Sequence, residues 1–182
     1  MSFEIEIKEN HDPGGYFWIR PVKIELVSKI TWDDVEELNE EISIEEGDVD
    51  CFLAYFFYKY FDEELFYNKN RFEGEEYIKG FQWYLTYNFF TYETMNKMLM
   101  EIENVSKLLE TNSSDEMLKP VKESYSIFYM CENDHPDYIN GNNKAIDNHL
   151  EVVIDFYKRF VRRIRQMMDN NPQVSILSIM GP

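Results

Sequence analysis

Apolar and charged residues alternate near the start of the chain, over residues 3–9, which is the period-two pattern of a half-buried strand. The turn-forming residues 12–15 follow, and the apolar run 16–20 after them predicts a second strand. Pro21 interrupts this run. Because proline cannot donate to a strand ladder, we expect it at an edge or a bulge, with the strand continuing over 22–28.

Three segments repeat apolar residues at steps of three and four, and they are predicted as helices. The first covers residues 31–42, where Thr31 can cap the helix and Asp34 stands at the capping-box distance. The second runs from Thr91 to about residue 110. The third and longest covers 144–169 and ends at an Asn-Asn-Pro sequence. The apolar positions of this third helix are Ile146, Leu150, Val153, Tyr157, Phe160, Ile164 and Met167.

Aromatic and short apolar runs account for the remaining elements. Over residues 51–61, periodicity does not separate a buried strand from a buried helix, and the aromatic richness favours a strand. Residues 77–89 alternate and predict a strand, and shorter runs predict strands over 121–131 and 174–180. The sequence therefore predicts the α+β class: a single domain over residues 1–182, with a mostly antiparallel sheet packed against about three helices.

The composition supports a folded domain and narrows the range of partners. Hydrophobic residues make up 44% of the 182 residues, with 14 Phe, 13 Tyr and 3 Trp, which excludes a mainly disordered chain. The formal net charge of −17 disfavours binding to nucleic acid and to anionic membranes, since both depend on Lys and Arg. We recognise no membrane-spanning run and no signal peptide, and two cysteines fit a reducing cytoplasm, so we expect a cytoplasmic protein.

The sequence lacks recognisable catalytic and cofactor motifs. It contains no glycine-rich phosphate loop, no GxSxG elbow and no CxxC or HExxH spacing, so we predict no catalytic residue, metal or cofactor. His11 and His135 stand beside aspartates, and Cys51 and Cys131 stand at the edges of apolar runs. The sequence leaves open whether either pair meets in space.

The negative charge is concentrated in the first half of the chain. Residues 1–80 carry 21 acidic and 8 basic residues, a balance of −13, against −4 for residues 81–182. Ten carboxylates fall within residues 33–50, and like charges four residues apart destabilise a helix. Two interpretations fit: a solvated helix face, or a surface that attracts a basic partner. The predicted partner-binding residues are Asp33, Asp34, Glu36, Glu37, Glu40, Glu41, Glu45, Glu46 and Asp48.

The basic run within residues 158–165 fits either a site for a phosphate or an acidic partner, or a structural role. The structural role is favoured, because bases late in a helix suit its dipole and can pair with the acidic half. The leading hypothesis for function is a non-catalytic acidic module that captures a basic protein, as a bacterial immunity or inhibitor protein does. The alternative is a small-ligand-binding protein or enzyme, with a site among the aromatic strands and loop carboxylates. A third hypothesis is a DNA mimic, which requires carboxylates spaced like phosphates.

Overall fold

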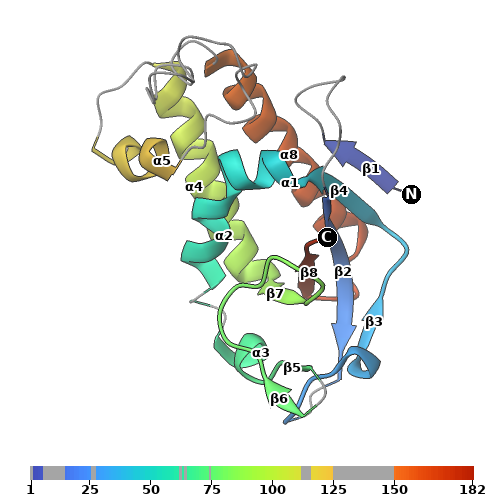
Figure 1. Cartoon of the computed structure of the whole chain (residues 1–182). Coiled ribbons are helices and arrows are strands. Elements are labelled where there is room, and N and C mark those ends of the chain that lie inside the picture. Colours follow the sequence, from blue (N-terminus) through green and yellow to red (C-terminus); the bar gives the residue numbers. More distant parts are fainter. Residues whose placement is uncertain are drawn as a thin grey trace.

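The computed structural model describes residues 2–5, 15–25, 28–61, 63, 65–73, 75–111, 116–124 and 150–182 (Figure 1). Its main sheet has the strand order β1-β4-β2-β8-β7, with β3 paired to β2. β1 lies parallel to β4, and the other four pairs of this sheet are antiparallel. The strands are β1 Ser2–Ile5, β2 Tyr16–Ile24, β3 Val35–Glu37, β4 Glu41–Glu45, β7 Asn88–Thr91 and β8 Ile176–Met180. The predicted α+β class with a mostly antiparallel sheet is confirmed.

Helices cover the sheet, and a separate two-stranded ribbon extends below it (Figure 1). The helices are α1 Glu46–Asp48, α2 Ala54–Phe61, α3 Leu65–Lys69, α4 Tyr92–Glu110, α5 Leu118–Ser124 and α8 Leu150–Asn170. A 3-10 helix, η1, spans Trp32–Asp34, and a π-helix, η2, spans Val49–Leu53. The ribbon pairs β5 (Phe72–Glu73) with β6 (Glu76–Tyr77).

The sheet separates a large core from a small one, because successive side chains of a strand point to opposite faces. Phe90 of β7 lies in the large core with residues of α2, α4 and α8, whereas Phe89 lies in the small core with Ile30 and Tyr87. Both phenylalanines are fully buried. Strand β7 therefore packs with one face against the large core, which contains residues of α2, α4 and α8, and with the other face against the small core.

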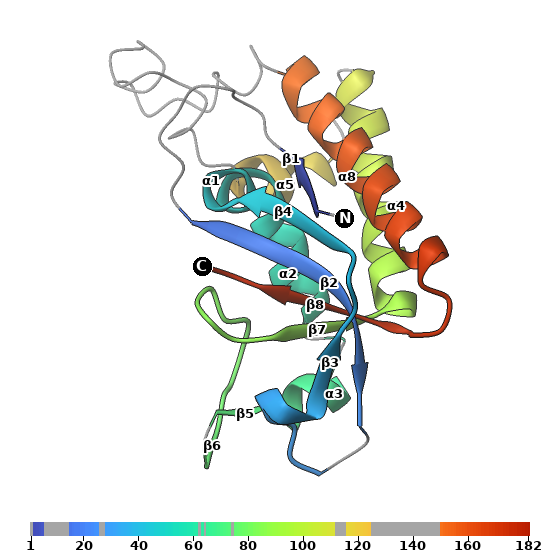
Figure 2. The same cartoon turned by 90° about the vertical axis from the view of Figure 1, so that its right-hand side faces the viewer.

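The two long helices form as predicted. Thr91 caps α4, since its side chain accepts a hydrogen bond from the amide of Thr94 at 3.2 Å. Helix α8 runs antiparallel to α4, because Arg165 pairs with Glu103 and Lys158 with Glu110. Figure 2 shows the two helices side by side along one flank of the sheet. Residues 144–149 of the predicted long helix lie outside the described residues.

The predicted strand 16–28 is described from Tyr16 to Ile24, with a bulge in its partners opposite Pro21. Ile19 pairs with Ile42 of β4 and Val22 with Glu37 of β3, so two residues of β2 face four of the partner segment. The Pro21 carbonyl accepts a hydrogen bond from the amide of Leu38 at 3.0 Å. The missing amide donor of proline therefore falls where β2 changes partner.

The predicted helix over 31–42 is wrong. Thr31 and Asp34 do form the predicted capping box, but it starts only the single turn η1. The chain then enters β3 and β4, where Ile42 and Ile44 are buried and pair with β2. Like charges four residues apart opposed the helix, and pairing with a central strand buried the isoleucines instead.

The predicted strand over 51–61 is also wrong, because this segment is helical in η2 and α2. Its buried side chains are Phe52, Leu53, Phe56, Phe57, Tyr60 and Phe61. They recur as adjacent pairs every four residues, which is a helical period that the aromatic richness masked.

The predicted strand over 77–89 is replaced by short β6, an irregular segment over 78–87, and β7. Two residues there have positive φ, Gly80 at 73° and Leu85 at 47°. Within the predicted strand 121–131, residues up to 124 belong to helix α5, and the remainder lies outside the described part of the chain. The predicted closing strand at 174–180 is confirmed as β8, Ile176–Met180.

Candidate binding face

The segment 78–87 presents two apolar side chains to solvent. Tyr84 and Leu85 are each 64% exposed. Leu85 has a φ of 47°, a left-handed backbone conformation that is unusual for a branched side chain. An exposed apolar tip on a strained turn often marks a contact site in a folded protein.

Asn88, the first residue of β7, holds segment 78–87 in place through hydrogen bonds of its side chain. Its side chain is fully buried. The Oδ1 atom accepts from the amide of Gln82 at 2.8 Å and from Arg71 Nη1 at 3.0 Å. The Nδ2 atom donates to the carbonyls of Gln82 at 2.8 Å and Ile179 at 3.0 Å. One side chain therefore ties the start of the segment to the neighbouring strand β8.

Arg71 holds the same segment from the other side. The residue is only 2% exposed, and its guanidinium donates to the carbonyls of Tyr87 at 2.6 Å, Ile78 at 3.3 Å and Gly80. It also lies 5.2 Å from the centre of the Phe61 ring. Burial lowers the pKa of Arg71 to about 10. Because its donors meet backbone carbonyls, this buried cation acts as a clamp on residues 78–87.

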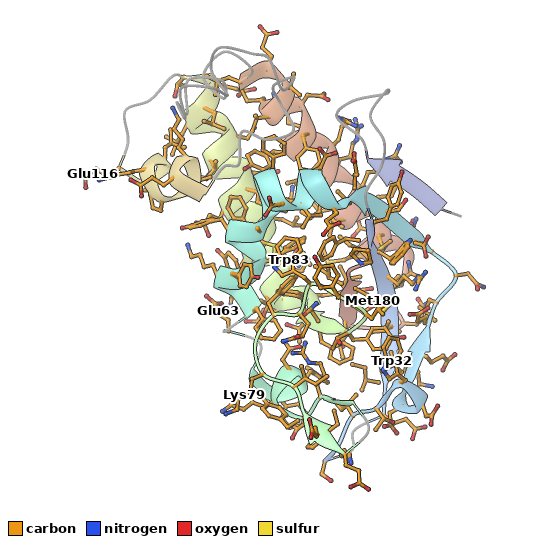
Figure 3. The ribbon with its side chains drawn as sticks, in the orientation of Figure 1. Trp32, Glu63, Lys79, Trp83, Glu116 and Met180 are labelled. Atoms are coloured by element: carbon orange, nitrogen blue, oxygen red, sulfur yellow. The ribbon has the colours of Figure 1, made fainter. Side chains whose placement is uncertain are left out.

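The C-terminal end of β8 supports the turn itself. A Cβ atom added at Gly181 would overlap the carbonyl oxygen of Trp83. Figure 3 shows Trp83 near the middle of the molecule, close to Met180. Trp83 packs edge-on against Phe17 with ring centres 5.0 Å apart. Glycine is therefore required at 181 for the close approach of two backbone segments.

Two carboxylates border the exposed tip. The Tyr84 hydroxyl donates to Glu46 Oε1 at 3.4 Å, and Glu46 Oε2 accepts from the amide of Gly15 at 3.4 Å. Asp50 is exposed nearby, and its pKa is raised by partial burial and by the charge of Glu46. The mutual repulsion of two carboxylates is relieved when a cation approaches both.

Tyr87 joins the segment to a second exposed aromatic residue. Its ring packs against Trp32 of η1 with centres 4.6 Å apart, and its hydroxyl donates to Glu37 at 2.8 Å. Burial and then this hydrogen bond raise the pKa of Tyr87. Trp32 remains 42% exposed, and its chain neighbour Asp33 is exposed. Figure 3 labels Trp83 and Trp32 well apart, so segment 78–87 meets η1 at its Tyr87 end.

The nine predicted partner-binding carboxylates do not form one surface. Asp33 and Glu36 are exposed, and Glu36 pairs with exposed Lys23 at 3.7 Å. Asp34 accepts from the amide of Thr31 at 2.8 Å, which lowers its pKa. Glu45 and Asp48 are 2% and 3% exposed, so their prediction as contact residues is corrected. Glu45 ends a strand that is buried over residues 42–45, and Asp48 lies between buried Gly47 and Val49, instead of lying on a solvated helix face.

Three more of the predicted carboxylates have partners within the molecule. Arg20 donates to Glu41 at 2.6 Å and to Glu37 at 3.0 Å. Burial lowers the pKa of Arg20, but the bonds to these two carboxylates outweigh it and raise that pKa overall. Glu40 accepts from the side chain of Asn171 at 2.6 Å. These residues stabilise the fold around the bulge and the end of α8.

The basic side chains of α8 find acids on the helices and not in the acidic segment. Arg165 pairs with Glu103 at 2.6 Å, Lys158 with Glu110, and Arg159 with Asp155 at 2.7 Å. These contacts therefore do not include the suggested pairing of the α8 bases with the acidic first half of the chain. The first-half carboxylates Asp33 and Glu36 have no contact with these α8 cations among the interactions of the described residues.

Within the described residues, no group of three or more His, Cys, Asp and Glu side chains is placed to hold a metal ion. No helix in the described ranges is long and apolar enough to cross a membrane. His11, His135, His149 and Cys131 lie outside the described residues, as does the side chain of Cys51.

Sequence reasoning missed Arg71 and Asn88, which position the exposed tip. A single amide side chain in the aromatic run Tyr87-Asn88-Phe89-Phe90 was the available signal, since a buried polar group needs partners. One of its partners, Arg71, stands 17 residues earlier. Comparison with protein-family models, with curated proteins and with solved structures gave no match, so the candidate face rests on this chain's own residues.

Proposed function

We propose that this protein is a non-catalytic binding module that captures a basic protein, in the manner of an immunity or inhibitor protein. Its contact surface is called the Tyr84–Trp32 face and consists of Trp32, Asp33, Glu36, Glu46, Tyr84 and Leu85. The observation that carries the proposal is the pair Tyr84 and Leu85, each 64% exposed on a turn that Arg71 and Asn88 hold in place.

The energetics of protein interfaces favour such a surface. A few aromatic anchors supply most of the binding free energy, and they act best when they are rigid before the partner arrives. Both anchors are held in place by the fold. Arg71 and Asn88 hold the segment that contains Tyr84. The ring of Tyr87 packs against Trp32. Little conformational entropy is then lost when a partner covers them.

The charge of the face selects a basic partner. Glu46 accepts a hydrogen bond from Tyr84, Asp33 follows Trp32 in the chain, and the whole chain carries −17. A surface of one sign raises association rates with an oppositely charged protein by about 10- to 1,000-fold at low salt. Arg and Lys side chains of the partner can also stack on Trp32, as a cation–π contact.

A capture experiment with matched variants tests the proposal. The immobilised protein is exposed to lysate of its source organism at 50 mM and 500 mM salt. The Debye length is longer than about 10 Å at the first concentration and shorter at the second. The test variants are Asp33→Lys/Glu36→Lys and Tyr84→Ala. The matched controls are Glu93→Lys/Glu123→Lys, two exposed acids on α4 and α5, and Phe66→Ala, an exposed aromatic residue on α3.

We expect one basic protein to be retained at low salt by the wild type and by both controls. Charge reversal at Asp33 and Glu36 should slow its association at least tenfold, and Tyr84→Ala should speed its dissociation. Equal retention by all five proteins, or retention that is lost only in the controls, would show that this face is not the contact surface.

A further inference from the structure

A groove runs between α4 and α8, on the far side of the molecule from the Tyr84–Trp32 face. It encloses about 590 Å³ and opens to solvent, within the range of small-molecule pockets. Two interhelical ion pairs bound it, Arg165 with Glu103 and Lys158 with Glu110. The two ion pairs are seven residues apart on each helix, so about 10 Å separates them along the helix axes.

Two cations lie between these ion pairs, Lys107 on α4 and Arg162 on α8. Neither forms an ion pair or a hydrogen bond with another side chain in the part of the chain that the structure describes. Both are exposed. The charged residues lining the groove include four bases and three acids, whereas the whole chain carries −17. The groove is thus a basic site on an acidic protein, which favours an anionic ligand.

A buried hydroxyl points to the same conclusion. Ser106 lines the groove and is 4% exposed, and its Oγ has no hydrogen-bond partner among the described residues. Buried hydroxyls in folded proteins almost always have one. Ser106 and Lys107 both line the groove, so a rotation of the covered Ser106 hydroxyl would bring this donor to a ligand oxygen held by Lys107 and Arg162.

The floor of the groove is apolar. Val161 and the ring of Tyr157 form it, and the Tyr157 hydroxyl is directed away, donating to the Phe52 carbonyl at 3.0 Å. Most of the lining surface is apolar, although seven of the lining residues are charged. A ligand that fits has a charged end and an apolar body.

We propose that the α4–α8 groove binds an amphipathic organic anion, with its carboxylate or phosphate on Arg162, Lys107 and Ser106 and its apolar body on Tyr157 and Val161. This inference is independent of the proposed function, because it uses no residue of the Tyr84–Trp32 face. An acidic amphipathic helix from a partner protein is the rival occupant, and it would need no single anionic head group.

Four ten-carbon probes that differ in head group test the inference: decanoate, decyl phosphate, decyltrimethylammonium and 1-decanol. Each is titrated below its micelle concentration into the full-length ¹⁵N-labelled protein, and backbone amide shifts report the affinity and the place of binding. The variants are Arg162→Ala, Lys107→Ala and their double variant. Arg159→Ala is the matched control, since it removes the same charge from the same helix but does not line the groove.

We expect at least one of the two anions to bind, with shifts confined to residues 103–110 of α4 and 157–170 of α8. Affinity should fall at least tenfold in Arg162→Ala, fall further in the double variant, and stay within twofold in Arg159→Ala. Binding of decanoate alone or decyl phosphate alone supports the inference and identifies the head group.

Three results would overturn it. The first is no shift with either anion, and the second is equal affinity for all four probes, which indicates apolar adsorption. The third is anion binding that the double variant leaves unchanged or that shifts amides only outside the groove. Both cations are exposed, so the variants should fold, and unchanged amide spectra away from the groove check this.

Discussion

Replacing Asn88 by leucine tests whether one buried amide holds the exposed tip in place. Leucine has nearly the same shape, so the change removes hydrogen bonds without opening a large cavity. Four bonds of 3.0 Å or shorter are lost: from the Gln82 amide at 2.8 Å, from Arg71 at 3.0 Å, to the Gln82 carbonyl at 2.8 Å and to the Ile179 carbonyl at 3.0 Å. Arg71 and Ile179 are buried and Gln82 is partly buried, so water does not fully replace the lost bonds.

The expected loss of stability follows from this count. Each bond contributes about 1 kcal/mol net, so Asn88→Leu should lower the free energy of unfolding by about 4 kcal/mol. For a chain of this length, that loss corresponds to a fall in Tm of roughly 8 to 16 °C. Domains are commonly stable by only about 5–15 kcal/mol, so the change is large.

Urea denaturation followed by circular dichroism measures the loss, and hydrogen exchange of the Gln82 amide measures the release of the segment. Asn96→Leu is the control, because Asn96 is exposed on α4 and should change stability little. A loss below about 1 kcal/mol for Asn88→Leu, or unchanged exchange at Gln82, would refute the clamp, since bonds of this kind are worth about that much each.

Three further predictions concern other parts of the molecule. Ser106→Ala should stabilise the ligand-free protein by about 1 kcal/mol in a thermal melt, because it removes a buried hydroxyl that lacks a partner; a clear loss would contradict this. Gly181→Ala should displace Trp83, seen as changed tryptophan fluorescence and lower stability, and a neutral effect would show that the backbones are not in close approach. Burial raises the pKa of Tyr92 to about 12, so this tyrosine should stabilise the fold fully below pH 10 and lose that contribution as pH rises from about 10 towards 12. Urea midpoints across this range should fall less steeply in Tyr92→Phe than in the wild type, and parallel slopes would contradict the assignment.

The parts of the fold that the sequence predicts correctly carry local signals. Helix α4 begins at a threonine cap and follows an unbroken helical period, and α8 follows one over six turns. The helix predicted over residues 31–42 is wrong because Ile42 fits the helical period but also forms a strand period with Ile44, and only pairing with β2 decides between them. Tertiary pairing decides between helix and strand in this segment, so local propensity could not predict the result.

The candidate site, like the fold, could be predicted from the sequence only in part. The acidity of residues 33–50 was evident from the sequence, but which carboxylates remain at the surface depends on the position of Arg20 and on the packing that buries β4 from Ile42 to Glu45. The exposure of Tyr84 depends on Arg71 and Asn88, which meet only in the folded chain. A count of charges locates an acidic region but does not select its contact residues.

Hydrogen exchange of the captured complex tests the Tyr84–Trp32 face most directly. The basic partner retained in the capture experiment is added to saturation, and amide exchange is compared with that of the free protein. The proposal predicts slower exchange over residues 82–87 and 31–37, with α4 and α8 unchanged. Protection confined to α4 and α8, or absent from residues 82–87, would contradict it.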